Sequence, residues 1–182
     1  MLKIVVYTDG GSRGNPGMAG AGVHITDDKG VTIKKASKAL GETTNNEAEY
    51  QAVILGLDTL KKLYGKPART ELGGEKFEVE VRLDSELVQK QLTGVYQIKE
   101  ERLWPYFMKI WNAKVADFPN LTFKYIPREQ NSVADGLANE AMDEQGNKKG
   151  LFWDIDTTLL LWYAIGSLIS HSANIFRFRL WG

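Results

Sequence analysis

Residues 2–17 have the sequence LKIVVYTDGGSRGNPG, an apolar run that ends in an aspartate and continues into a glycine-rich stretch. β-branched and aromatic residues followed by glycine, asparagine and proline predict a buried strand that stops abruptly at Asp9. The carboxyl ends of strands are where α/β folds place their reactive groups. An isolated Asp-Gly pair is more often a simple turn, in which the aspartate bonds its own backbone. Other residues of the chain must therefore decide the role of Asp9.

The composition is that of one ordinary globular domain, with room for an appendage. The 182 residues are 43% hydrophobic and 25% charged, enough to bury a substantial core. The absence of cysteine excludes disulfides, thiolate zinc sites and thiol catalysis, and it fits a cytoplasmic location. Basic and acidic residues balance at 23 each, so a nucleic-acid partner would need a local basic face. We expect no signal peptide, because the predicted first strand follows Met1 directly.

Hydrophobic periodicity and turn residues predict alternating strands and helices beyond the first strand. Thr44 and Glu47 have the spacing of a capping box at the start of a helix. Helices placed between the later strands predict right-handed crossovers and parallel pairing with the first strand. We therefore expect an α/β fold: a mixed five-stranded sheet, three antiparallel strands followed by two parallel ones, with helices on both faces. The predicted strands are 2–7, 19–26, 31–40, 77–83 and 121–126, and the predicted helices are 43–64, 85–92, 101–118 and 132–145.

The chain is expected to divide into a domain of residues 1–146 and an apolar extension of residues 147–182. Residues 147–150 predict a linker, and three of the five tryptophans follow it. The apolar run 159–169 is shorter than the roughly 18 residues that span a bilayer, so we expect no membrane span. Packing on the domain or self-association is favoured, because an exposed segment of this kind would aggregate. A partner-binding segment, an interfacial anchor and a non-native read-through sequence are the alternatives.

Four carboxylates fall where predicted elements begin or end. Asp9 and Asp84 each follow a strand, and neighbouring parallel strands would bring both to one edge of the sheet. Glu49 and Asp135 lie near the starts of helices, where Glu47 is the better capping residue and Glu49 has no local role. Two residues apart on a helix, these glutamates project about 200° from each other, so only one can face the sheet edge. Turn and capping roles explain each aspartate singly, but they do not explain the joint pattern.

Convergence of these carboxylates would require cations. Two carboxylates about 4 Å apart repel by roughly 4 kcal/mol at an effective dielectric near 20. Four could not stay ionised together without positive charge nearby. A cluster of oxygen ligands, without histidine or cysteine, selects Mg²⁺ or Mn²⁺ over zinc. A pair of such ions can clamp the attacking and leaving oxygens of a phosphodiester. The residues alone therefore predict hydrolytic phosphoryl chemistry without a protein nucleophile.

Four motifs resemble those of type 1 ribonuclease H, and they occur in that family's order over roughly residues 1–144. The resemblance implies a ribonuclease H-like fold and an endonuclease, a hydrolase that cuts the RNA strand of RNA–DNA hybrids to leave 3′-hydroxyl and 5′-phosphate ends. The alternative is a catalytically inactive hybrid-binding module of the same fold, against which the complete carboxylate set argues. The motifs are YTDGGSRGNPG at 7–17, TTNNEAEY at 43–50, LDS at 83–85 and ADGLAN at 134–139.

The resemblance also implies which residues form the site. Two Mg²⁺ ions, with Mn²⁺ as a substitute, would be held by catalytic carboxylates: Asp9, Glu49, Asp84 and Asp135. A second set would line the minor groove of the hybrid and recognise RNA 2′-hydroxyls: Gly11, Ser12, Asn15, Asn45 and Asn46. Only the 2′-hydroxyl distinguishes RNA from DNA at a given site, and glycines permit close approach of the backbone.

The chain departs from many bacterial members of the family in two places. It lacks their histidine in the loop before the last helix and has Arg128 there, as archaeal-type members do. We assign Arg128 to phosphate or product contact, with a solvated loop arginine as the alternative. The basic, tryptophan-rich protrusion is not evident: Trp104 and Trp111 have a spacing typical of core residues, with Lys109 and Lys114 as candidate backbone contacts. We therefore expect weaker hybrid affinity and looser discrimination against double-stranded RNA.

Overall fold

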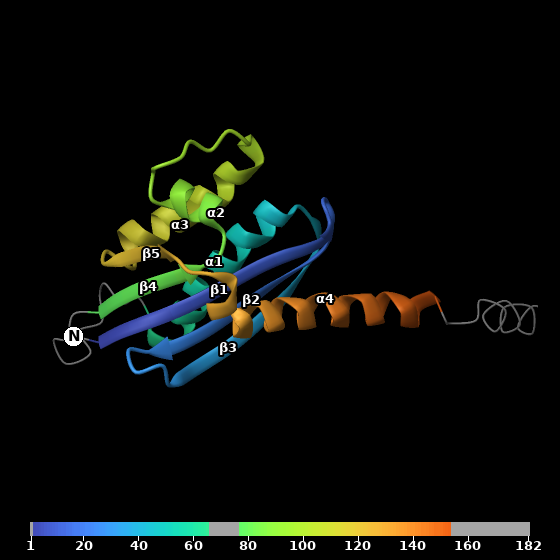
Figure 1. The fold of residues 1–182 in the computed structure, drawn as a ribbon, viewed down its shortest axis with the longest axis horizontal. Helices are drawn as coiled ribbons and strands as arrows, with labels where there is room; N and C mark the ends of the chain where they lie inside the picture. Colours follow the sequence, from blue (N-terminus) through green and yellow to red (C-terminus); the bar gives the residue numbers. More distant parts are fainter. Residues whose placement is uncertain (1, 66–76, 154–182) are drawn as a thin grey trace, which may run out of the picture. The chain divides into compact units, whose positions relative to one another are not determined.

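The computed structural model describes residues 2–65 and 77–153 (Figure 1). The chain divides into two compact units, Met1–Gln145 and Gly146–Gly182. Most of the second unit lies outside the described residues, including the apolar run for which we expect packing or self-association. Among the helices that the structure describes, none combines the length and apolar content needed to cross a bilayer.

A mixed sheet of five strands forms the centre of the first unit. Its strands are β1 (Leu2–Gly14), β2 (Gly17–Asp27), β3 (Thr32–Thr43), β4 (Phe77–Leu83) and β5 (Leu121–Tyr125). They lie in the order β3-β2-β1-β4-β5, with β1, β2 and β3 antiparallel and with β4 parallel to both β1 and β5. This topology confirms the predicted sheet of three antiparallel strands followed by two parallel ones.

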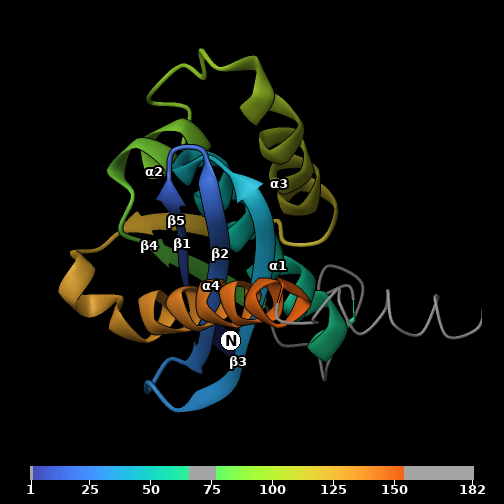
Figure 2. The same cartoon turned by 90° about the vertical axis from the view of Figure 1, so that its right-hand side faces the viewer.

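Helices cover both faces of the sheet, as predicted. The α-helices are α1 (Asn45–Tyr64), α2 (Glu86–Leu92), α3 (Trp104–Ala116) and α4 (Ser132–Trp153), with short 3₁₀ turns at Glu101–Leu103 and Arg128–Gln130. On one face, Val53 and Leu57 of α1 join Ile4 and Val6 of β1 in a continuous buried core. The first half of α4 crosses the opposite face, in front of the strands in Figure 2.

The first strand does not stop at Asp9, so that prediction is wrong. β1 continues through the glycines to Gly14, and β2 pairs with it as far as Gly14↔Gly17. The antiparallel ladder satisfies the backbone groups of this stretch, which sequence patterning assigns to a loop. Only the parallel pairing with β4 ends near the aspartate, at Thr8↔Leu83. Asp9 therefore lies inside a strand but at the end of the parallel part of the sheet.

The predicted linker at residues 147–150 is also wrong, because α4 continues through it to Trp153. Isolated glycines at 146 and 150 weaken a helix by about 1 kcal/mol each relative to alanine, and no proline blocks its continuation.

Trp104 and Trp111 lie on the exposed side of α3, contrary to the expectation that their spacing indicates core. They are 55% and 45% exposed, and Met108 and Val115 continue the same stripe. Ile110 fills the buried face of α3 instead. The two lysines on α3 have partners within the domain: Lys109 pairs with Asp58 at 3.0 Å, and Lys114 lies over the ring of Phe123.

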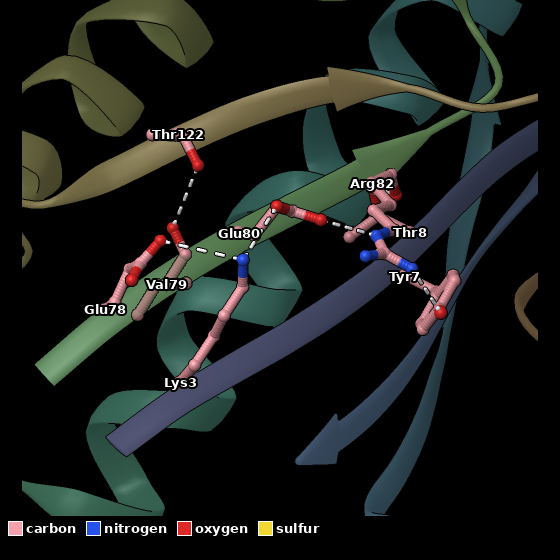
Figure 3. A network of polar contacts seen from close by, with 8 residues as sticks. All are labelled: Lys3, Tyr7, Thr8, Glu78, Val79, Glu80, Arg82 and Thr122. Atoms are coloured by element: carbon pink, nitrogen blue, oxygen red, sulfur yellow. Dashed lines mark hydrogen bonds and ion pairs between the residues drawn. The ribbon is translucent and has the colours of Figure 1, made fainter. Parts of the chain in front are cut away.

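A network of charged side chains locks β1 to β4 (Figure 3). Lys3 Nζ of β1 donates to Glu80 Oε2 of β4 at 3.2 Å. Arg82 Nε donates to the other oxygen of Glu80 at 2.6 Å, and Arg82 Nη1 donates to the Tyr7 hydroxyl at 2.8 Å. Tyr7 and Arg82 are paired two residues before Asp9 and Asp84, respectively. The network therefore supports the register that brings these two aspartates together.

Candidate active site

Three carboxylates meet where the parallel pairing of β1 and β4 ends. Asp9 lies one residue beyond the last pair, Thr8↔Leu83, and Asp84 directly follows β4. Glu49 comes from the start of α1. One oxygen from each of the three carboxylates lies within 4.8 Å of the other two. The structure therefore brings together three of the four carboxylates singled out in the sequence.

Glu49 reaches the cluster because α1 contacts β1 at a glycine. A Cβ at Gly10 would lie 2.2 Å from the Ala48 carbonyl carbon and 2.4 Å from Glu49 N, so any side chain there would push the helix away. Glu47 is engaged at the helix start, where its carboxylate accepts from Thr44 N at 3.0 Å and confirms the predicted capping box. The two glutamates therefore have separate roles.

Burial and mutual repulsion oppose ionisation of the cluster. Burial, followed by the charges of Asp84 and Asp135, raises the pKa of Asp9 to about 7. Burial, followed by the charges of Asp9 and Asp84, raises the pKa of Glu49 well above its usual range. Asp9 and Glu49 are each 8% exposed, so water screens their repulsion little.

The donor set at this cluster fits a divalent cation. All three side chains offer carboxylate oxygens, the ligands that Mg²⁺ and Mn²⁺ prefer. Glu49 Oε2 is buried and has no hydrogen-bond partner among the described residues. A cation bound here would give this oxygen a partner and would offset the repulsion that raises both pKa values.

Asp135 lies on the same cavity but is engaged with other groups. Its Oδ1 accepts from Arg128 Nη2 at 2.6 Å, and its Oδ2 accepts from Asn139 Nδ2 at 3.2 Å. Its charge still contributes to the raised pKa of Asp9. The Arg128 side chain is 74% exposed, and its positive charge opposes the rise in the pKa of both Asp9 and Glu49. The fourth carboxylate is therefore near the cluster and held by an arginine.

A cavity of about 410 Å³ joins all four carboxylates to part of the expected substrate-binding set. Four residues of that set line it: Gly11, Ser12, Asn45 and Arg128. Asn15 and Asn46, which the structure also describes, are not part of the lining. Four further side chains that sequence analysis did not single out complete it: Arg13, Tyr125, Asn139 and Met142. Asn139 had a usable signal, since it follows Asp135 by one helical turn on the same face.

Two asparagines clamp the β1–β2 hairpin to the start of α1. Asn45 Oδ1 accepts from Ser12 N at 3.3 Å, and Asn15 Oδ1 accepts from Asn45 N at 3.1 Å. A backbone N–H can only donate, so these contacts fix which end of each amide is oxygen. Asn15 is therefore not part of the cavity lining but bonds to Asn45, which is.

The raised pKa of Asp9 leads to a stability prediction for the metal-free protein. A carboxyl with a pKa of 3.8 when unfolded and about 7 when folded opposes folding increasingly as the pH rises between these values. In EDTA, Asp9→Asn should match the wild type near pH 4. At pH 8 its Tm should be higher by at least about 3 °C, because each kcal/mol of destabilisation that is removed raises Tm by about 2–4 °C. Calorimetry across this pH range measures the difference, and equal Tm values at pH 8 would contradict the expectation.

A sheet in the order β3-β2-β1-β4-β5, with carboxylates gathered at the end of its parallel pair, defines the ribonuclease H-like fold. The model of the reverse transcriptase-like family matches residues 7–141. The structure of LC11-RNase H1, isolated from compost by a metagenomic approach, is 51% identical with a TM-score of 0.72, over 80% of this chain and 99% of that chain. The chain belongs to the type 1 ribonuclease H family.

A second structure of LC11-RNase H1 supports this assignment, and a further relative matches over part of its length. The crystal structure of LC11-RNase H1 in complex with RNA/DNA hybrid is 49% identical with a TM-score of 0.71, over 78% of this chain and 98% of that chain. The bifunctional protein Rv2228c of Mycobacterium tuberculosis is 37% identical over 143 residues, which are 78% of this chain. The match spans 36% of the length of Rv2228c, so the chain corresponds to only part of that relative.

Proposed function

We propose that this chain is an endonuclease that hydrolyses the RNA strand of RNA–DNA hybrids and leaves 3′-hydroxyl and 5′-phosphate ends. The observation that carries the proposal is the convergence of Asp9, Glu49 and Asp84 in a cavity that Asp135 also lines. The hybrid complex of the related LC11-RNase H1 supports this choice of substrate. The absence of cysteine fits a reducing compartment such as the cytoplasm.

Two divalent cations, Mg²⁺ or in its place Mn²⁺, would be held by the four carboxylates. When bound, such ions supply a water nucleophile at neutral pH and stabilise the charge of the leaving oxygen. The chain itself contributes the donor geometry. Asp9 and Glu49 offer buried carboxylates, and Asp84 offers a half-buried one. Arg128, whose side chain is mostly exposed although it pairs with Asp135, would contact a phosphate of the substrate or product in place of that carboxylate.

Recognition of the RNA strand is assigned to the hairpin and to the start of α1. Gly11, Ser12 and Asn45 face the cavity, Asn15 braces Asn45, and Asn46 is the next residue along the helix. Since the Oδ1 atoms of Asn15 and Asn45 accept from backbone N–H groups, each amide has its NH₂ left to donate to the minor groove.

Asn45→Ala should weaken hybrid binding about tenfold, because it removes one donor to substrate and the bond that holds Ser12. Fluorescence anisotropy with a labelled hybrid in EDTA measures the dissociation constant. Lys29→Ala, on the opposite hairpin turn at Asp27–Gly30, serves as the control and should leave binding unchanged. Unaltered binding by Asn45→Ala would remove this residue from the recognition set.

A cleavage assay tests the proposal as a whole. A hybrid labelled on the RNA strand is incubated with the full chain in Mg²⁺, Mn²⁺ or EDTA, and the ends of the products are identified by enzymatic ligation. We expect metal-dependent cutting of the RNA strand alone. Tight binding without cutting would instead support the inactive hybrid-binding module. A parallel arm with an RNA duplex tests the expected looser discrimination, which the absence of any duplex cleavage would overturn.

A further inference from the structure

Asn131 is a buried asparagine that bonds directly to one carboxylate of the site. It lies between the 3₁₀ turn Arg128–Gln130 and the start of α4, and it is 1% exposed. Its Nδ2 donates to the Thr8 carbonyl at 2.9 Å and to Asp84 Oδ1 at 3.0 Å. One amide group therefore joins the backbone next to Asp9 to the side chain of Asp84.

The orientation of this amide follows from its partners. The Thr8 carbonyl and the Asp84 carboxylate are both acceptors, so only the NH₂ end of Asn131 can bond to both. The reversed amide would place its oxygen against two others. The backbone carbonyl of Asn131 accepts from Asp135 N at 3.0 Å, which begins α4. Asn131 therefore bonds to the backbone next to Asp9, to the side chain of Asp84 and to the backbone of Asp135.

The side chain of Asn131 does not take the role that its position suggests. An asparagine just before a helix commonly caps it by accepting a backbone N–H with its side-chain oxygen. Here Oδ1 is buried and has no partner among the described residues, while the amide is turned to Asp84. Leaving a buried acceptor without a partner costs about 1–3 kcal/mol. Helix capping therefore does not account for this side chain, whose amide is bonded to Thr8 and Asp84 instead.

We propose that Asn131 is a positioning residue that orients the Asp84 carboxylate for cation binding. Its bond to Oδ1 restricts rotation of the carboxylate and leaves Oδ2 for the cation, while its bond to Thr8 holds Asp84 at a set distance from β1. Partners that orient metal-binding carboxylates typically change metal affinity by about 10–100-fold when they are removed. The inference rests on the proposed metal-dependent function, and its test separates the two.

Isothermal titration of the full chain with Mn²⁺ alone provides the test, with Asn131→Ala compared with the wild type. We expect Mn²⁺ affinity to fall at least about tenfold and the Mn²⁺ midpoint of hybrid cleavage to rise by the same factor. Hybrid affinity in EDTA should stay unchanged. In the Asp84→Asn background, the further replacement of Asn131 should have little effect on Mn²⁺ affinity, because its partner carboxylate is already gone.

Gln91→Ala is the matched control, since Gln91 is also a buried amide. Its Oε1 accepts from the Tyr50 hydroxyl at 3.0 Å, and it does not line the cavity of the four carboxylates. It should lower Tm without changing Mn²⁺ affinity.

The inference would be overturned if Asn131→Ala left Mn²⁺ affinity unchanged. It would also be overturned if Asn131→Ala lowered Mn²⁺ affinity equally in the wild type and in the Asp84→Asn background. If the alanine variant does not fold, Asn131→Ser undergoes the same comparison with the same criteria. If the wild type binds Mn²⁺ and cuts hybrid, and the Asn131 variants bind Mn²⁺ equally well, only this inference is refuted. If the wild type binds no Mn²⁺, both proposals are refuted.

Discussion

Replacement of Asp84 by asparagine is expected to lower the rate of hybrid cleavage at least about a thousandfold, since metal ions contribute several kcal/mol to such reactions. The substitution removes one negative charge from the three-carboxylate cluster but keeps the size of the side chain. The carbonyl of the new amide can still accept from Asn131 Nδ2, so the local packing should survive. The loss should therefore come from weakened cation binding and not from unfolding.

A neighbouring carboxylate provides the control for Asp84. Glu86 lies two residues further on, is exposed and pairs with Lys90 at 2.7 Å. Glu86→Gln should leave the cleavage rate within about twofold, because surface ion pairs contribute little. Rates are measured on the labelled hybrid at saturating Mg²⁺, and Tm in EDTA shows that both variants are folded. An Asp84→Asn protein with more than a tenth of wild-type activity would be incompatible with the proposed mechanism.

Local patterns in the sequence predict most of the fold and the three carboxylates that cluster, Asp9, Glu49 and Asp84. The alternation of strands and helices implied parallel pairing of β1 and β4, and that pairing places Asp9 beside Asp84. The distinction between Glu47 and Glu49 followed from helix geometry and capping, both local properties. In each case the deciding interactions join residues close in sequence or follow from the handedness of crossovers.

The features that were missed depend on contacts between residues distant in sequence. Continuation of β1 through the glycines needs β2 as a partner, which no property of the glycines themselves indicates. Asn131 bonds to residues 123 and 47 positions away, so neither contact leaves a periodic signal. The side of α3 that faces the core depends on what packs against it. Trp104 and Trp111 therefore have the spacing typical of buried residues, although they lie on the exposed face of α3.

Gly22→Ala is expected to lower Tm by about 5–10 °C, because overpacking a close contact costs about 1–3 kcal/mol and sometimes more. Gly22 of β2 pairs with Asp9, and α4 packs against the strand at this glycine. A Cβ there would lie 2.0 Å from the Ala134 carbonyl oxygen and 2.6 Å from Ala138 N. Both contacts are with helix backbone, which no rotamer change can relieve, so α4 must move off the sheet. Cleavage should fall as well, since Asn131 and Asp135 move with the start of that helix.

Gly136→Ala, on α4 itself, distinguishes this steric effect from a general sensitivity to alanine. A Cβ at Gly136 would meet nothing within 4 Å, so the added methyl group has open space. Alanine is the better helix former by about 0.8–1.0 kcal/mol, so this variant should gain Tm by about 2–4 °C. Thermal unfolding by circular dichroism measures both variants. The two variants should change Tm in opposite directions. In Gly22→Ala the added methyl group strains the contact between β2 and α4, and in Gly136→Ala it only stabilises the helix. If Gly22→Ala unfolds at the wild-type temperature, close backbone contact is not what holds α4 against the sheet.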